Sequence, residues 1–123
     1  MTASAHAVEL LEVAAKAADS KQAEDLVALD VSGPLPLTDI FLLASARNER
    51  NVLAIADEIE DKLAEVGTKA LRREGRNEAR WVLLDFGDLV VHVFHQEDRA
   101  YYSLERLWKD CPVVPIDLPQ VPA

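Results

Sequence analysis

The chain has 123 residues, half of them hydrophobic, which suits one globular domain with a single core. Its formal net charge is −9, and residues 1–66 carry 13 acidic against 5 basic side chains, so this half should repel nucleic acid and suit a basic protein partner. A lone cysteine excludes an internal disulfide, and no stretch approaches the roughly 20 apolar residues of a membrane-spanning helix. With no signal-peptide pattern at its start, the protein is expected in the cytoplasm.

The first half predicts a helix, two strands and a second helix. Alanine-rich residues 4–20 carry apolar side chains at helical spacing. Two short apolar runs, 25–31 and 39–46, are typical of buried strands and are separated by a Gly-Pro turn. The clearest helix is expected from about 48 to 66, where apolar residues recur at helical spacing and Gly67 supplies a stop.

The second half predicts three strands, a last helix and a tail. Residues 68–73 can form a short strand, and "WVLLDFGDLVVHVFH" (81–95) can form a hairpin. A final helix is expected at 99–109, with Asp98 as its N-cap. The side chains expected to anchor this helix are Tyr101, Leu104 and Trp108.

This order predicts an α/β domain over residues 1–110, with a mixed sheet of about five strands and three main helices. The long β-α-β spacing allows a parallel crossover, whereas the late hairpin requires an antiparallel pair. Residues 111–123 are rich in proline and are expected to form an extended or frayed tail.

The hairpin contains Asp85-Phe86-Gly87-Asp88, for which three roles can be considered. Asp-Phe-Gly positions a metal-binding aspartate in kinases, but the sequence lacks the glycine-rich loop, strand lysine and catalytic loop of a kinase. Asp85 and Asp88 could instead share a divalent cation. Aspartates that flank a turn also hydrogen-bond local backbone, and this interpretation is favoured. His92 and His95 should point to opposite sides of a strand, so no metal or other cofactor is expected.

A two-residue loop at Phe86-Gly87 would pair Trp81 with His92 and give the hairpin two apolar faces. One face would be aliphatic. The other, called the aromatic face below, carries Trp81, Leu83, Val90, His92 and Phe94. Either a second layer covers this face or it remains open to a partner, and three helices are few for covering both sides. We interpret it as a contact surface whose residues are Trp81, Leu83, His92 and Phe94, with Arg73 and Glu74 at the rim.

Several motifs resemble the ribosomal silencing factor family, also called Iojap-like proteins. They are "DVS" (30–32), "TDIFLLASARNERNVLAIADEIEDKL" (38–63), "REG" (73–75) and "WVLLDFGDLVVHVFHQEDRAYYSLERLW" (81–108). The resemblance covers nearly the whole chain, and the last motif is not a generic pattern. One departure is Ser45-Ala46, where the family often has Ser-Gly.

The resemblance implies a mixed α/β domain related to the nucleotidyltransferase fold, without its catalytic motif. It also implies binding to the large ribosomal subunit through its ribosomal protein fourteen, so that the small subunit cannot join and translation is repressed under nutrient limitation. A role in large-subunit maturation and a homodimer are further implications.

The alternative function is a nucleotide-acting, transferase-like enzyme that uses Asp85 and Asp88. Such transferases carry a Gly-Ser turn and two aspartates one residue apart, whereas these aspartates lie three apart. Kinship of fold does not carry function, so the sequence favours a protein that is not an enzyme.

Overall fold

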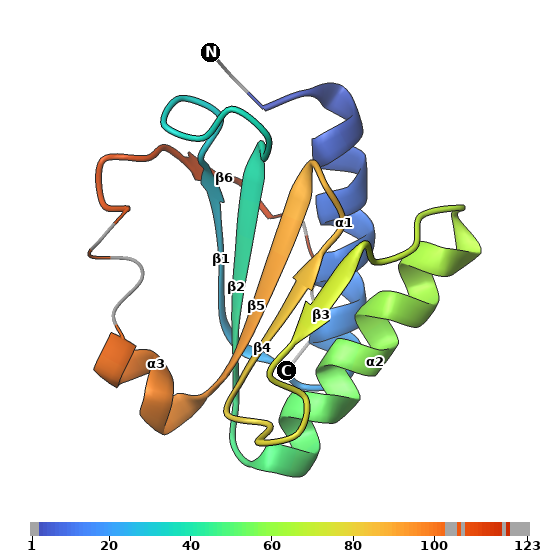
Figure 1. The fold of residues 1–123 in the computed structure, drawn as a ribbon, viewed down its shortest axis with the longest axis vertical. Coiled ribbons are helices and arrows are strands. Elements are labelled where there is room, and N and C mark those ends of the chain that lie inside the picture. The colour runs from blue at the N-terminus through green and yellow to red at the C-terminus, as the bar shows by residue number, and fades with distance from the viewer. Residues whose placement is uncertain (1–2, 103–105, 107, 117, 119–123) are drawn as a thin grey trace.

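The structure is a computed structural model that describes residues 3–102, 106, 108–116 and 118. Its elements are, in order, α1 (Ala5–Ser20), β1 (Glu24–Asp30), β2 (Ile40–Ala46), α2 (Glu49–Glu65), β3 (Arg72–Glu74), β4 (Trp81–Asp85), β5 (Leu89–His95), α3 (Gln96–Tyr102) and β6 (Val113–Val114). The helices α1 and α2 lie together on one face of the sheet, and α3 lies on the other side (Figure 1). The predicted α/β domain with a mixed sheet and three helices is confirmed.

The two long helices begin and end where the sequence places capping residues. The Ser4 hydroxyl accepts a hydrogen bond from the Ala7 N–H at 3.1 Å, and the Asn48 side chain accepts one from the Asn51 N–H at 2.8 Å. Gly67, with φ of +88°, follows the C-cap of α2. No helix among the described residues is long and apolar enough to cross a membrane.

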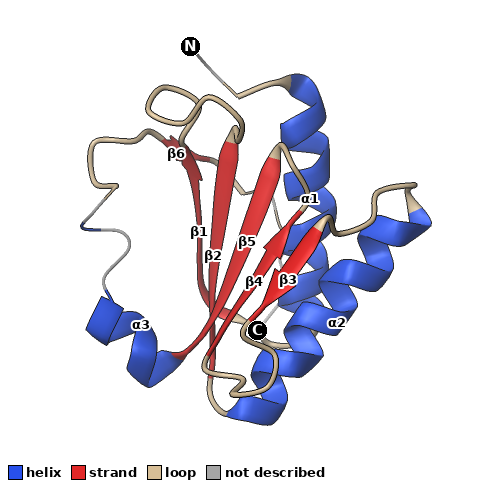
Figure 2. Ribbon diagram, in the orientation of Figure 1, coloured by secondary structure: helices blue, strands red, loops and turns tan. Residues whose placement is uncertain are grey.

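The six strands lie in the order β3-β4-β5-β2-β1-β6 (Figure 2). β2 and β5 run parallel, and every other neighbouring pair is antiparallel. All seven residues of β2 and all seven of β5 are buried, because these central strands are covered on both faces. The main core therefore lies between the sheet and the two long helices, and a smaller one lies on the opposite face.

The β4–β5 hairpin differs from the predicted pairing by two residues. Trp81 pairs with Phe94 and Leu83 with His92, so the predicted pairing of Trp81 with His92 is wrong. The turn lies one residue later than predicted, because the Phe86 N–H donates to the Leu89 carbonyl oxygen at 2.9 Å and leaves Gly87 and Asp88 between them. An even shift keeps each side chain on its predicted face, because strand side chains alternate with a period of two. The aliphatic face is confirmed within the main core by Val82, Leu84, Leu89, Val91 and Val93.

Other boundaries also differ from the sequence predictions. β3 begins only at Arg72, and α3 begins at Gln96, so Asp98 lies in the first turn of α3 rather than at its N-cap. Val113–Val114, predicted to lie in a frayed tail, pair with β1 and form a sixth strand. Residues 103–105 and 107, together with the side chains of Tyr101 and Leu104, lie outside what the structure describes.

Arg99 ties α3 to the ends of β1 and β2. Its side chain is buried, and its Nη1 donates to the Ser45 Oγ at 2.9 Å and to the Asp25 carbonyl oxygen. A buried guanidinium must be satisfied by such acceptors, since an unpaired buried charge is very costly. This contact fixes where the chain leaves β5.

Gly75→Ala should destabilise the fold far more than Gly67→Ala. Both glycines have a positive φ, +86° and +88°, which costs an L residue about 1–2 kcal/mol. A Cβ at Gly75 would also lie 1.9 Å from the Trp81 carbonyl oxygen, whereas at Gly67 it would meet nothing within 4 Å. We expect urea denaturation to show a loss of about 1 kcal/mol for Gly67→Ala and of more than about 3 kcal/mol for Gly75→Ala. Equal losses would contradict the close packing at Gly75.

Candidate functional site

A hollow of about 300 Å³ opens beside Trp81, where β3 and β4 form one edge of the sheet. Its walls are Glu74, Gly75, Trp81 and Leu83. Trp81 and Leu83 are half-buried and Glu74 is exposed, so an indole, an aliphatic side chain and a carboxylate are all accessible there. Three of the six predicted contact residues thus share one concave surface.

His92 and Phe94 lie beneath this hollow and not at its surface. Their side chains are 4% and 1% exposed, and Val90 beside them is buried as well. The aromatic face is covered in part by half-buried side chains of Leu35, Trp108 and Cys111. The two alternatives that the sequence left open are therefore both partly realised: the centre of the aromatic face is core, and its β4 margin reaches the surface.

Arg73 lies on the opposite side of β3 from the hollow. It pairs with Leu84 on the helical face of the sheet, and its Nε bonds Glu60 of α2. Strand alternation instead places Arg72 and Glu74 on the side of Trp81. Arg72 is the candidate that sequence reasoning missed, because Arg73 and Glu74 were placed together at the rim although adjacent strand residues point to opposite faces. Its Nε lies 3.8 Å from the Glu74 Oε2.

A cluster of aromatic rings joins β4 to β2 beneath the hollow. The ring centroids of Trp81 and Phe94 are 5.0 Å apart, and those of Phe41 and His92 are 4.8 Å apart. Trp108 meets Phe41 edge-on at 5.5 Å. Offset and edge-on aromatic pairs of this kind add to the stabilisation from burial, so these rings stabilise the floor of the hollow.

His92 is a buried neutral histidine within this cluster. The Trp81 Nε1–H donates to its Nδ1 at 3.2 Å, which places the imidazole proton on Nε2. Nε2 is buried and has no hydrogen-bond partner among the described residues. Burial lowers the pKa of His92 to about 4. An unsatisfied buried donor costs about 1–3 kcal/mol, so this ring is not the most stable choice for its site.

Asp85 makes the local hydrogen bond expected of a turn residue. Its Oδ1 accepts from the Gly87 N–H at 2.8 Å. The carbonyl oxygen of Asp88 accepts from the N–H groups of Asp39 and Ile40, each at 3.0 Å, and so joins the hairpin to β2. Among the described residues, no group of three or more His, Cys, Asp or Glu side chains could hold a metal ion.

Ser45 is followed by Ala46, so this pair lacks the glycine of the transferase turn considered in the sequence analysis. Ser45 is buried, and its Oγ accepts from the Arg99 guanidinium at 2.9 Å. A fixed positive charge at this position opposes the binding of a metal cation beside it. The local chemistry therefore disfavours the transferase hypothesis.

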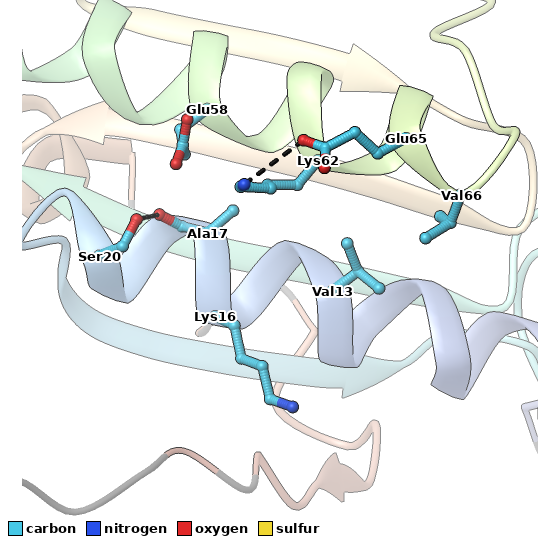
Figure 3. Close-up of a pocket in the computed structure, with 8 residues that line it drawn as sticks. All are labelled: Val13, Lys16, Ala17, Ser20, Glu58, Lys62, Glu65 and Val66. Carbon is cyan, nitrogen blue, oxygen red and sulfur yellow. Dashed lines mark hydrogen bonds and ion pairs between the residues drawn. The ribbon is translucent and has the colours of Figure 1, made fainter.

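A second hollow, of about 480 Å³, lies between α1 and α2 on the helical side of the molecule (Figure 3). Its polar groups are bonded locally: Lys62 pairs with Glu65 at 3.4 Å, and the Ser20 hydroxyl donates to the Ala17 carbonyl oxygen at 2.7 Å. Lys16 points away from it (Figure 3). These groups do not converge on one point, so the Trp81 hollow is the stronger candidate.

An accessible tryptophan with an arginine at a polar rim is typical of surfaces that recognise other proteins. The fold is a mixed α/β domain, and the hollow beside Trp81 is its candidate site. The family model described as "Ribosomal silencing factor during starvation" matches residues 4–123. The chain belongs to the ribosomal silencing factor family.

Curated relatives carry the name of this family or the name Iojap. The chain is 48% identical over 108 residues to a ribosomal silencing factor of Bacillus subtilis (strain 168), which covers 88% of this chain and 92% of that protein. It is 33% identical over 108 residues to the chloroplastic protein Iojap of Zea mays, covering 85% of this chain and 45% of the plant protein. The predicted resemblance is confirmed.

Two crystal structures have a similar fold. One, from Bacillus halodurans, superposes with a TM-score of 0.79 at 47% identity and covers 89% of this chain and 99% of that one. The other, from Chromobacterium violaceum, has a TM-score of 0.81 at 34% identity and covers 83% and 85% of the two chains. These experimental structures support the mixed α/β architecture.

His92 should make the folded state less stable as the pH falls from 7.5 to 5.5. Because its folded pKa of about 4 lies below the ordinary 6.5, the unfolded chain takes up this proton in that window and the folded chain does not. The free energy of unfolding should fall by about 1.4 kcal/mol through this group. In His92→Phe, urea denaturation should show a fall in the free energy of unfolding between pH 7.5 and 5.5 that is smaller by about 1.4 kcal/mol. Equal drops in the two proteins would mean that burial does not hold the ring neutral.

Proposed function

We propose that this protein is a non-enzymatic repressor of translation that binds the large ribosomal subunit in the cytoplasm. It contacts the large-subunit ribosomal protein fourteen and thereby prevents the small subunit from joining under nutrient limitation. The names of its relatives, which describe silencing of the ribosome, support this proposal. The observation that carries it is that Trp81, Leu83 and Glu74 line one accessible hollow.

The distribution of charge supports a basic protein partner that lies near RNA. α1 and α2 together carry nine acidic and three basic side chains, so the helical layer repels phosphate. The hollow lies on the other face of the sheet, where Arg72 and Glu74 can make polar contacts around the indole. A complementary field also speeds the encounter with a basic surface. The protein would therefore dock with its sheet edge toward ribosomal protein and its helices away from RNA.

The mechanism is occupancy and involves no chemical step. A domain that sits on the face of the large subunit used for joining excludes the small subunit sterically. The same contact can form during large-subunit maturation, because it requires only that the ribosomal protein to which this chain binds is already in place. A homodimer that used the Trp81 hollow would compete with this contact.

Trp81→Ala should weaken binding to isolated large subunits by at least about tenfold, because a central tryptophan often contributes 2 kcal/mol or more to a protein contact. Binding is measured by co-sedimentation, and subunit joining by sucrose-gradient profiles. Leu37→Ala is the matched control, since Leu37 is 85% exposed and lies outside the hollow. Wild-type binding by a folded Trp81→Ala protein would remove the hollow from the contact. A wild-type protein that failed to bind large subunits would reject the proposed function.

The neighbouring arginines of β3 offer a second test of which face docks. Arg72→Ala should weaken large-subunit binding about twofold to fivefold, as expected for a rim residue, because Arg72 lies on the side of the hollow. Arg73→Ala should leave binding unchanged, since Arg73 faces α2. The same co-sedimentation assay gives both values. A larger loss of binding in Arg73→Ala than in Arg72→Ala would place the contact on the helical side of β3.

A further inference from the structure

His92 lies beneath the hollow at the centre of the aromatic face. Its strand neighbours are Leu83 on β4 and Leu43 on β2, and its side chain is only 4% exposed. The Phe41 ring meets it at 64° with the centroids 4.8 Å apart, and the Phe94 ring lies nearly parallel to it at 6.1 Å. This packing holds the plane of the imidazole in one orientation.

The orientation of the imidazole directs Nδ1 toward Trp81. The indole Nε1–H donates to this nitrogen at 3.2 Å, so Nδ1 carries a lone pair and Nε2 carries the proton. Nε2 is buried and finds no acceptor among the described residues. Burial keeps the pKa of His92 at about 4, and Nδ1 therefore remains an acceptor at neutral pH.

An apolar ring of similar size would fill this space without burying an unsatisfied N–H group. The imidazole adds an interaction that such a ring lacks, which is an acceptor for the indole of Trp81. The same indole lines the hollow with Leu83 and Glu74. The hydrogen bond therefore links a buried residue to the orientation of a side chain at the candidate contact surface.

We propose that His92 is a positioning residue for the docking hollow, which holds the Trp81 indole through the Nε1–H to Nδ1 hydrogen bond in the orientation that a partner meets. This inference rests on the proposed function, because it assigns His92 a role in the same contact. His92 does not touch the partner. Its contribution is preorganisation, since an indole that is already fixed need not be ordered during binding.

The test uses a Trp108→Phe parent, in which Trp81 is the sole tryptophan of the chain. His92→Phe removes the acceptor and keeps a ring. His92→Asn keeps an acceptor, because its Oδ1 lies near the place of Nδ1. Three quantities are measured for each protein: the free energy of unfolding, the time-resolved fluorescence anisotropy of Trp81 in the free protein, and the affinity for isolated large subunits by co-sedimentation.

We expect the more stable of the two variants to have the lower affinity for large subunits. His92→Phe should be at least as stable as the parent, yet its indole should rotate faster and its affinity should fall about tenfold through lost preorganisation. His92→Asn should be less stable, because it buries an amide, but its indole should remain slow and its affinity should stay within about threefold of the parent. A residue that merely supports the fold would change stability and affinity together.

Slow indole motion and parental affinity in His92→Phe would overturn the proposal, as would affinities that follow the stabilities. If His92→Phe does not fold, His92→Leu takes its place with the same expectations, since it too lacks an acceptor. If the parent fails to bind large subunits while His92→Phe still frees the indole, the proposed function is rejected and the positioning of Trp81 by His92 is supported. The two failures are therefore distinguishable.

Discussion

The burial of β5 on both of its faces is the constraint on which the rest of the structure depends. All its residues from Leu89 to His95 are buried, between β4 and an equally buried β2. Such a strand needs a layer on each side. The long helices form one layer, while α3 lies toward the other side of the sheet (Figure 1), where Trp108 and Cys111 also pack against the second core. β4 is covered fully on one face only, because its residues alternate between buried and half-buried. The hollow therefore lies on the face of β4 that is only partly covered.

The position of Trp81 is determined from two directions. Arg80, the residue before it, bonds Asp98 at 2.7 Å, Glu49 at 2.9 Å and Glu97 at 3.2 Å, and these hydrogen bonds raise its pKa above the usual value. The three carboxylates belong to the first turns of α2 and α3, where a helix dipole favours negative charge. The backbone of Trp81 is thus anchored to both helix starts, and its indole is bonded from below by His92. This double anchoring explains how a large side chain at a sheet margin can be ordered without full burial.

The sequence was sufficient to predict which side chains share a face, but not how deeply they are buried. The hairpin pairing was wrong by two residues, yet Trp81 and Leu83 kept their side, because an even shift does not change alternation. Arg73 and Glu74 were both expected at the rim, but adjacent strand residues point to opposite faces, so only Glu74 lies on the side of Trp81. The second core, which includes Phe94, is covered in part by Trp108 and Cys111 from a distant segment, and β6 is a two-residue strand in a proline-rich segment. Such features arise from tertiary contacts, which local sequence patterns do not encode.

Partial covering of the aromatic face makes the proposed contact surface compatible with a stable unbound protein. A fully open face of five large side chains would be an extended apolar patch that favours self-association. With His92, Phe94 and Val90 buried, the exposed apolar part is reduced to Trp81 and Leu83 beside charged Glu74 and Arg72. A few anchors can still dominate the binding energy of a protein contact, because the surrounding rim contributes mainly by excluding water. Under the proposed function, a small anchor of this kind would contribute binding energy without the extended apolar patch that favours self-association.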